Sequence, residues 1–400
     1  MDFFTMFYSA ETPKDFFESK SCGFTANEIA HQPVMWRTLS RYLQEVKPQL
    51  DEFMKGLNDI KNLRIILTGA GSSGFVGRAV AGFAAKINGR TYEAIHNTDI
   101  ISAPEVYLPS RLAETPTLLI SFARSGNSPE SEGAVHYARK RVKNLYELAI
   151  VCDGESRLGK TTRTSDKSLL LVMPEGTNDK GFAMTSSVTT MLLAGVAALC
   201  HHQYDAIIKD ISLLADTVEK SGSAMAKTAE ACAAAGFERA WYLGSGAFTA
   251  LVQEGALKMM ELTNGAVVAG SNNAPEFRHG PKTVMNPKTL TVHFIAGDAF
   301  TAQYDTDLFN EMYNQRDGNR LIALHDANKP MQADWLVPYQ TDAYTAITEA
   351  AVGIQGLVFM QLLSMYTSLA LKVPTDNPSP TGLVNRVVQG VTVYGGPSCL

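Results

Sequence analysis

Short apolar segments alternate with amphipathic stretches from residue 63 onward, and this alternation is the main structural signal in the chain. Four apolar runs end in turns rich in glycine, serine or asparagine and lead into helical stretches: Leu63–Leu67, Thr117–Phe122, Leu148–Cys152 and Leu169–Met173. Repeated strand–turn–helix units are typical of a parallel sheet with helices on both faces. The pattern therefore predicts an α/β fold with a doubly wound parallel sheet.

The same pattern starts again in the second half of the chain. The segment Ile65–Gly71 is echoed by Ala240–Gly246, and each enters a Gly-x-Gly turn followed by a helical stretch. Leu290–Ile295 and Leu321–His325 supply further strand candidates, and Ala343–Leu371 is expected to be a long closing helix. The repeat predicts a second domain that is similar to the first.

Four segments are expected along the 400 residues, which exceed what one hydrophobic core usually supports. They are a helical N-terminal segment (1–48), a first domain (49–210), a second domain (211–374) and a tail (375–400). In the N-terminal segment, Thr25 and Glu28 have the spacing of a helix capping box. The prolines at 374, 378 and 380 predict an irregular tail that folds back only if something holds it.

Composition narrows the classes of partner. The chain is 45% hydrophobic and 19% charged with a net charge of -5, so it lacks the basic field that nucleic acids require. Its five cysteines include no C-x-x-C pair, which favours neither a zinc site nor a disulfide framework. The N-terminus lacks the pattern of a signal peptide, and a cytoplasmic location is expected. Ala350–Leu371 is long enough to span a membrane, but interrupting glutamine, serine and threonine favour a core or interface helix, so no membrane partner is expected.

Three loops that follow predicted strands carry hydroxyl groups beside helix N-termini: Gly69–Gly74, Ala123–Ser128 and Glu175–Thr190. Helix N-termini favour anions, although serine and threonine in any one loop can be ordinary caps. Three such loops at one edge of a sheet favour a phosphate-binding site. Gly69–Gly74 also matches the dinucleotide fingerprint, but Glu93 does not clearly close the next strand, which leaves a nicotinamide-dependent dehydrogenase as an alternative.

Acid–base chemistry is indicated further along the chain. Glu254, Lys258 and Glu261 are spaced four and three apart, so a helix places them on one stripe. A solvated face with a Glu–Lys pair is the plainer interpretation of that spacing. His279 lies in a long Gly/Asn-rich loop (264–282), which we expect to lack regular structure. A histidine near a glutamate would supply the two proton carriers that an isomerisation needs.

At these residues the chain resembles the SIS-domain aldose-ketose isomerases, and most closely the tagatose-6-phosphate ketose/aldose isomerase family, also described as galactosamine-6-phosphate deaminase/isomerase. The motifs that carry the resemblance are Glu28–Pro33 with Trp36, Gly69–Ser73, Ser125–Ser128, Glu175–Asn178, Glu254–Lys258, Arg278–Pro281, Asn377–Pro380 and Asn385–Thr392. The resemblance covers essentially the whole chain. It implies two tandem SIS domains, each with a flavodoxin-like sheet, after a short helical preface.

The resemblance also implies residue roles. Glu261 would move a proton between C1 and C2, His279 would assist ring opening, and Glu254 and Lys258 would line and polarise the site. The phosphate of a hexose or hexosamine phosphate would be held by Ala70, Gly71, Ser72, Ser73, Arg124, Ser125, Asn127 and Ser128, with Phe182 and Thr185 nearby. No metal or redox cofactor is required.

A more distant resemblance to the isomerase half of glucosamine-6-phosphate synthase adds a partner and two departures. In that relative the histidine reaches a neighbouring subunit's site, which implies a homodimer or larger homo-oligomer. The synthase has Ser-Gln-Ser where this chain has Ala123-Arg124-Ser125, so one hydroxyl is missing and Arg124 could supply a charged phosphate contact. It has a tail lysine where this chain has Gln389, so a role for that amine is not carried over.

The expected reaction is release of ammonia from an amino-sugar phosphate. The synthase has a glutaminase domain, whereas SIS-like sequence here follows directly on the N-terminal segment, and no source of glutamine-derived ammonia is expected. Running the related chemistry in the release direction would convert galactosamine-6-phosphate to tagatose-6-phosphate. Two alternatives remain: an aldose-ketose isomerase acting on unaminated hexose phosphates, and a non-catalytic SIS protein that senses sugar phosphates.

Overall fold

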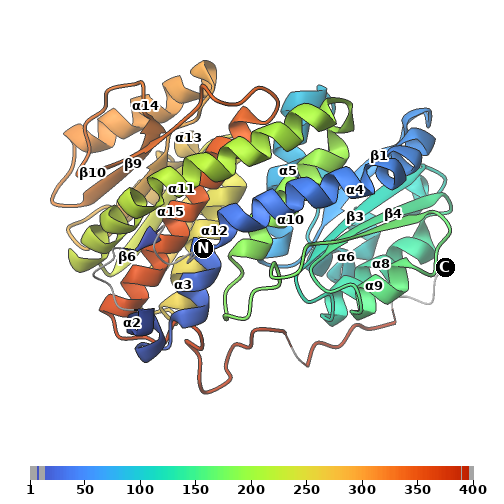
Figure 1. Ribbon diagram of the computed structural model, residues 1–400, viewed down its shortest axis with the longest axis horizontal. Coiled ribbons are helices and arrows are strands. Elements are labelled where there is room, and N and C mark those ends of the chain that lie inside the picture. Colours follow the sequence, from blue (N-terminus) through green and yellow to red (C-terminus); the bar gives the residue numbers. More distant parts are fainter. Residues whose placement is uncertain (1–6, 9–13, 389, 396–400) are drawn as a thin grey trace. The chain divides into compact units, whose positions relative to one another are not determined.

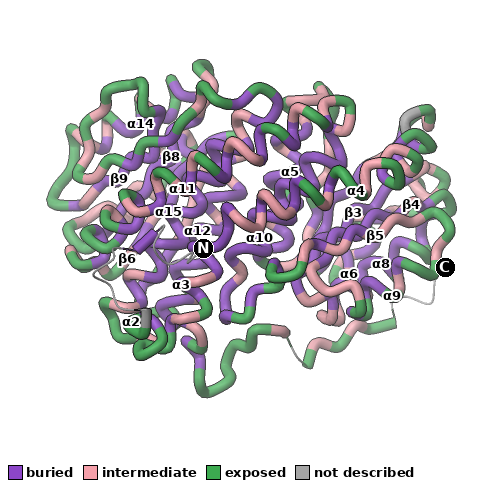
Figure 2. Tube along the Cα trace, in the orientation of Figure 1, coloured by how far each residue is buried: buried purple, intermediate pink, exposed green. Residues whose placement is uncertain are grey.

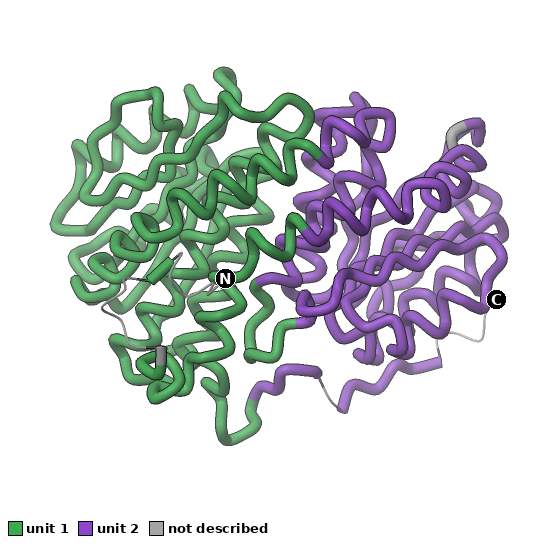
Figure 3. Tube along the Cα trace, in the orientation of Figure 1, with its two compact units in different colours: residues 1–37, 179–185, 209–383 green, residues 38–178, 186–208, 384–400 purple. Residues whose placement is uncertain are grey.

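The computed structural model describes residues 7–8, 14–388 and 390–395, and the chain forms two compact units (Figure 3). Unit 1 is drawn from residues 1–37, 179–185 and 209–383, and unit 2 from residues 38–178, 186–208 and 384–400. The chain passes from one unit to the other within helices α4 (Gln32–Asn58) and α11 (Tyr204–Ala234). The boundaries predicted at 48, 210 and 374 stay predictions, and Gln389 lies outside the described residues.

Unit 2 contains a five-stranded, all-parallel sheet in the order β2-β1-β3-β4-β5. Its strands are β1 (Arg64–Thr68), β2 (Glu93–Ala94), β3 (Thr117–Ala123), β4 (Leu145–Val151) and β5 (Ser168–Val172). The chain adds β2 on one side of β1 and then β3 on the other. Ligands of such sheets bind beyond the carboxyl ends of the strands at this reversal, which here lies between β1 and β3.

Helices cover both faces of the unit 2 sheet. The side chain of Phe122 points to the face where Val80 and Gly195 bring in α5 (Ser72–Asn88) and α10 (Ser186–Leu199). The opposite face packs Ile66 and Leu119 against a second set of helices. These are α6 (Asn97–Ser102), the short α7 (Pro104–Tyr107), α8 (Pro129–Arg141) and α9 (Arg157–Thr162). Figure 1 labels α6, α8 and α9 below β3 and β4. This is the doubly wound arrangement that the apolar runs predicted.

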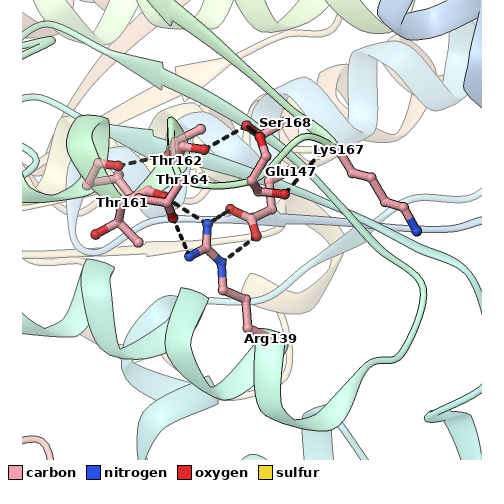
Figure 4. A network of polar contacts seen from close by, with 9 residues as sticks. Arg139, Glu147, Thr161, Thr162, Thr164, Lys167 and Ser168 are labelled. Atoms are coloured by element: carbon pink, nitrogen blue, oxygen red, sulfur yellow. Dashed lines mark hydrogen bonds and ion pairs between the residues drawn. The ribbon is translucent and has the colours of Figure 1, made fainter.

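A partly buried ion pair ties three of these elements together. Figure 4 shows the guanidinium of Arg139 on α8 directed at the carboxylate of Glu147 on β4, with N–O distances of 2.7 and 2.9 Å. The same guanidinium donates to the Thr161 carbonyl and the Thr164 hydroxyl in the connection to β5. Because bidentate pairs have restricted geometry, this network fixes the amino-terminal ends of β4 and β5. The predicted phosphate loops lie at the opposite, carboxyl ends of the strands.

Unit 1 contains a second five-stranded, all-parallel sheet in the order β10-β9-β8-β6-β7. Its strands are β6 (Arg239–Gly244), β7 (Val268–Asn272), β8 (Thr289–Phe294), β9 (Arg320–Asp326) and β10 (Trp335–Tyr339). Strand β6 occupies the place that β1 has in the other sheet, with the next strand on one side and the following strand on the other. The predicted repeat is therefore confirmed at the level of sheet topology.

Helices cover both faces of the unit 1 sheet, and its central strands β6, β8 and β9 are largely buried (Figure 2). On one face, Phe248 of α12 (Phe248–Leu262) stacks on Phe294, with ring centroids 4.3 Å apart, beside α15 (Thr348–Ala370). On the other face, Leu243 packs with α13 (Ala274–Phe277) and α14 (Ala299–Asn314). Helix α15 is long and apolar enough to cross a membrane, but 94% of its most apolar window is buried within the protein, as a core helix requires.

Three predictions about local structure are wrong. The segment 264–282 is not irregular, because it contains β7, α13 and a 3-10 turn at Pro281–Val284. Thr25 and Glu28 do not form a capping box. Helix α3 (Gly23–Ala30) follows α2 (Lys14–Ser19) and begins at a Cys22 cap, and both side chains bond to distant segments instead. The closing helix also starts at Thr348 rather than Ala343.

The tail is irregular over residues 375–388 and 390–395, as expected, and contacts within each unit hold it. In unit 1, the carboxylate of Asp376 accepts hydrogen bonds from the backbone N–H groups of Phe24 and Thr25 at 3.0 and 2.8 Å. This carboxylate therefore satisfies free donors at the start of α3. In unit 2, the carbonyl of Tyr394 accepts a hydrogen bond from Tyr137 at 2.6 Å.

Candidate active site

Lys258 lies between two glutamates on helix α12. Its ammonium nitrogen is 3.2 Å from a carboxylate oxygen of Glu254 and forms a close ion pair with Glu261. The side chains of Glu254 and Lys258 are fully buried, and that of Glu261 is 24% exposed. Burial alone would lower the pKa of Lys258, but the two neighbouring carboxylates raise it above its ordinary value. The stripe is thus a buried charged triad, not a solvated face.

The position of α12 explains this burial. The helix starts just after β6 ends at Gly244 and then packs against β6, β7 and α15. Burial of a charge is costly unless it is paired, so the Glu–Lys–Glu arrangement is what permits these residues on a covered helix. Glu261 is the member with exposed surface, and it is therefore the group that a bound molecule can reach.

His279 follows α13 in a turn that ion pairs hold on both sides. Arg278 bonds to Asp307 and Glu311 of α14, each at 2.8 Å, and Lys282 forms a close pair with the same Glu311. These pairs hold the pKa of Glu311 below its ordinary value, with Lys282 the larger cause. His279 itself is exposed, and within residues 7–8, 14–388 and 390–395 no group hydrogen-bonds to its imidazole. The loop is fixed while the imidazole stays open to a ligand.

The first predicted phosphate loop connects β1 to α5 in unit 2. Ala70 and Gly71 precede the helix, and Ser72 and Ser73 form its first residues, both nearly buried. Gly69 packs so closely on this turn that a Cβ there would lie 2.5 Å from the carbonyl carbon of Ser73. The loop is therefore a tight strand-to-helix turn at the reversal of the sheet, with the geometry of an anion site.

The second predicted loop connects β3 to α8, and most of its polar groups already have protein partners. The Ser128 hydroxyl caps α8 by accepting from the Ser131 N–H, and the Asn127 side chain accepts from the Arg157 N–H at 3.0 Å. Arg124 is 6% exposed and donates to the Arg386 carbonyl of the tail at 2.6 Å. Ser125 accepts only weakly, from the Asn127 N–H at 3.3 Å. These contacts shape the loop, and the predicted phosphate contacts of its side chains stay predictions.

Phe182 and Thr185 belong to the part of the third loop that packs in unit 1. Thr185 is fully buried, and its hydroxyl and backbone N–H both donate to the carboxylate of Asp179 at 3.0 Å. Phe182 is 9% exposed. Unit 1 thus holds Glu254, Lys258, Glu261, His279, Phe182 and Thr185, whereas the first two phosphate loops belong to unit 2.

Two buried carboxylates near the third loop were not singled out as functional from the sequence. Glu28 accepts hydrogen bonds from the backbone N–H groups of Lys180 and Gly181, and Asp179 holds Thr185. An acidic residue inside an otherwise apolar helical stretch was the available signal at Glu28. By contrast, both carboxylate oxygens of Glu93 are bonded to Arg64, at 2.6 and 2.7 Å, so this side chain is engaged within the sheet and not presented to a dinucleotide ribose.

Known proteins share this architecture and sequence. Residues 58–200 match the SIS domain family. The D-galactosamine-6-phosphate deaminase AgaS of Shewanella sp. (strain ANA-3) is 36% identical over 93% of this chain and 92% of its own. The solved tagatose-6-phosphate ketose/aldose isomerase from Escherichia coli is 32% identical, with a TM-score of 0.82 over 93% of this chain and 96% of that chain.

A solved chain from Clostridium novyi NT is 34% identical, with a TM-score of 0.90 over 97% of this chain and 98% of that chain. Identity at this level over nearly the full length of both proteins extends the similarity from the SIS domain match to both sheets. The chain is a tandem SIS protein and belongs to the family of AgaS and the tagatose-6-phosphate ketose/aldose isomerases.

Proposed function

We propose that this chain is an enzyme that converts galactosamine-6-phosphate and water to tagatose-6-phosphate and ammonia. The observation that carries the proposal is the buried triad on α12, in which only Glu261 retains exposed surface. A protein that only senses a sugar phosphate has no need of this triad, because burying the Glu254–Lys258 pair costs stability that binding does not require. The name of the 36% identical relative from Shewanella supports the choice of amino sugar.

The proposed reaction starts with ring opening at C1. The exposed imidazole of His279 carries the proton between the ring oxygen and the C1 hydroxyl, which gives the open-chain aldehyde. Arg278 and Lys282 hold the turn that carries His279, so the backbone of this turn does not have to become ordered when the substrate binds. An exposed histidine also fits the implied homo-oligomer, in which this residue would serve a neighbouring copy of the chain.

Proton transfer follows at C2. Glu261 removes the C2 proton and returns a proton to C1, while the C1 oxygen gains a proton and the C2 nitrogen loses one, which leaves C1 as an alcohol and C2 as an imine. Water adds to C2, the C2–N bond breaks, and the nitrogen leaves as ammonia, so the ketone oxygen comes from water. Lys258 supplies one counter-charge beside both carboxylates, so the fully buried Glu254 stays paired while Glu261, which is partly exposed, exchanges protons with the substrate.

The phosphate is assigned to the β1–α5 and β3–α8 loops of unit 2. Both lie at the reversal of a parallel sheet, and Ser72 and Ser73 stand at the N-terminus of a 17-residue helix, where backbone N–H groups favour an anion. An aldose-ketose isomerase that acts on an unaminated hexose phosphate is the second candidate. The name of the solved Escherichia coli relative favours it, and it needs the same groups but no imine hydrolysis.

One substrate panel separates the two candidates. The purified protein is incubated with galactosamine-6-phosphate, glucosamine-6-phosphate and tagatose-6-phosphate while ammonia and ketose are followed together. The proposal predicts equal amounts of ammonia and ketose from galactosamine-6-phosphate. Conversion of tagatose-6-phosphate to an aldose with no ammonia from either amino sugar would support the second candidate, and no conversion of any of the three would contradict both.

A further inference from the structure

Segment 179–185 has no regular secondary structure and is held by side chains of unit 1. Glu28 of α3 accepts a hydrogen bond from the Lys180 N–H, and each of its carboxylate oxygens lies 3.2 Å from the Gly181 nitrogen. Glu28 is 4% exposed and Gly181 is buried, so water cannot replace these bonds. Buried backbone donors that lose their partner carry the full desolvation cost.

A second contact holds the other end of the segment. The side-chain amide of Gln361 on α15 donates to the Thr185 carbonyl at 3.3 Å and accepts from the amide of Gln32 at 2.8 Å. Gln32 and Gln361 have no exposed surface. Glu28 and Gln32 therefore act on the same seven residues, one directly and the other through Gln361.

Between these two ends lies Phe182, which the family resemblance places near the phosphate of the sugar. We propose that Glu28 is a positioning residue, which holds segment 179–185 and through it Phe182 in the conformation that binds the sugar phosphate. This inference rests on the proposed function for the identity of the ligand and not for the contacts themselves. It gives a role to the Glu28–Gln32 motif, which touches none of the groups assigned to the chemistry.

The charges around Glu28 support a positioning role for this carboxyl and not a catalytic one. Asp179 and Asp376 face the same carboxylate, His31 lies beside Asp179, and Lys180 contributes its backbone N–H. Burial, with Asp179 the next cause, raises the pKa of Glu28 to about 8. A glutamine at this position keeps the length and one acceptor oxygen, whereas an alanine removes both acceptors.

A substitution at Gly181 tests the contact between Glu28 and segment 179–185 by changing the segment and not the glutamate. A Cβ on Gly181 would lie 2.9 Å from a carboxylate oxygen of Glu28 and 3.2 Å from the Thr25 hydroxyl oxygen. Gly181→Ala should push the segment away from Glu28, and most of that effect should vanish once Glu28 is alanine. Non-additivity of this kind is the signature of a direct contact.

The experiment measures amide exchange by mass spectrometry and the Kd for galactosamine-6-phosphate by calorimetry, the latter with every variant combined with Glu261→Gln so that the ligand is not consumed. The variants are Glu28→Ala, Glu28→Gln, Gly181→Ala and the double variant E28A/G181A, with Asn27→Ala, a half-buried neighbour on α3, as the matched control. We expect Glu28→Ala to raise Kd on the order of tenfold, which matches the net loss of about one hydrogen bond. Glu28→Gln should keep most of the affinity, and Gly181→Ala should add little to Glu28→Ala.

Amide exchange separates positioning from general loosening. In Glu28→Ala, residues 180–181 should exchange faster while α12 keeps the protection of the wild type. A Kd unchanged in both Glu28→Ala and Gly181→Ala would overturn the inference, as would faster exchange throughout unit 1. If Glu28→Ala does not fold, Gly181→Ala alone decides between these outcomes.

Failure of the proposed function is seen separately. A wild-type protein that binds galactosamine-6-phosphate but releases no ammonia contradicts the proposed reaction and leaves the Kd comparison intact. A wild-type protein that does not bind this sugar phosphate overturns the positioning role as well.

Discussion

The ammonium nitrogen of Lys258 lies 3.2 Å from a carboxylate oxygen of Glu254, and neither side chain has exposed surface. On a solvated helix such an i, i+4 pair stabilises by only about 0.2 to 0.5 kcal/mol. In a buried pair, removal of either partner strongly destabilises the fold, because it leaves an uncompensated charge. The pair and the adjacent Glu261 are therefore the most constrained polar group in the candidate site.

Replacement of Lys258 tests that constraint. Lys258→Met should reduce the free energy of unfolding by about 3 to 5 kcal/mol, because two carboxylates lose their counter-charge. Chemical denaturation measures this loss. The matched control is Lys288→Met, which breaks a pair with Glu238 whose side chains are 62% and 63% exposed, and which should cost about 1 kcal/mol or less. Equal losses in the two variants would contradict the buried triad.

The His279 turn provides a second test. Glu311 is the residue that pairs with both Arg278 and Lys282, so Glu311→Ala should release the turn on both sides. We expect turnover to fall severalfold, with a stability loss of only about 1 kcal/mol because these pairs are partly exposed. Asp307→Asn is the control, since it removes one exposed contact to Arg278. A Glu311→Ala variant with the turnover of Asp307→Asn would show that the turn needs no such support.

The raised pKa of Glu28 predicts a pH dependence of stability. Its pKa rises to about 8 in the folded chain because of burial and Asp179, so folding favours the protonated carboxyl. This contribution is fully present below the ordinary pKa of a glutamate and is lost as pH rises through the folded value. We therefore compare the Tm of Glu28→Gln with the Tm of the wild type at two pH values. The difference, variant minus wild type, should be larger at pH 8.5 than at pH 5. A difference that is constant over this range would contradict the assignment.

Much of the fold could be predicted because apolar runs and Gly/Ser turns report strands that are buried on both faces. Strands β1, β3, β5, β6, β8 and β9 lie at or within about two residues of the predicted runs, and β4 begins three residues before its run, at Leu145. The strand β7 was missed because Val268–Asn272 contains glycine, serine and asparagine, which are typical of loops. Its backbone is extended because it pairs with β6, a tertiary contact that local sequence does not encode.

The candidate site shows the same limit at the level of single residues. Spacing placed Glu254, Lys258 and Glu261 on one stripe, and the structure joins them, but spacing could not show that α15 and the sheet cover this stripe. At Thr25 and Glu28 the spacing of a capping box was present, and partners distant in sequence took both side chains. The spacing of residues in the sequence determines which side chains share a helix face. Tertiary packing determines which elements contact that face.

The first phosphate loop can be tested without catalysis. Gly69→Ala places a Cβ within 2.5 Å of the Ser73 backbone, so the β1–α5 turn must deform, and the Kd for galactosamine-6-phosphate should rise at least tenfold. Gly56→Ala on α4 is the matched control, because a Cβ there meets nothing within 4 Å and alanine favours a helix by about 0.5 to 1 kcal/mol. If the two variants bind alike, the phosphate is not held at this turn.

The central claim is that Glu261 carries the proton in an ammonia-releasing isomerisation. The most direct measurement compares wild type and Glu261→Gln for both turnover of galactosamine-6-phosphate and its Kd. We predict that ammonia and ketose formation falls by at least a hundredfold in Glu261→Gln, in the range that proton-transfer groups contribute, while the Kd changes by less than about threefold. Near-normal turnover by Glu261→Gln would contradict the account.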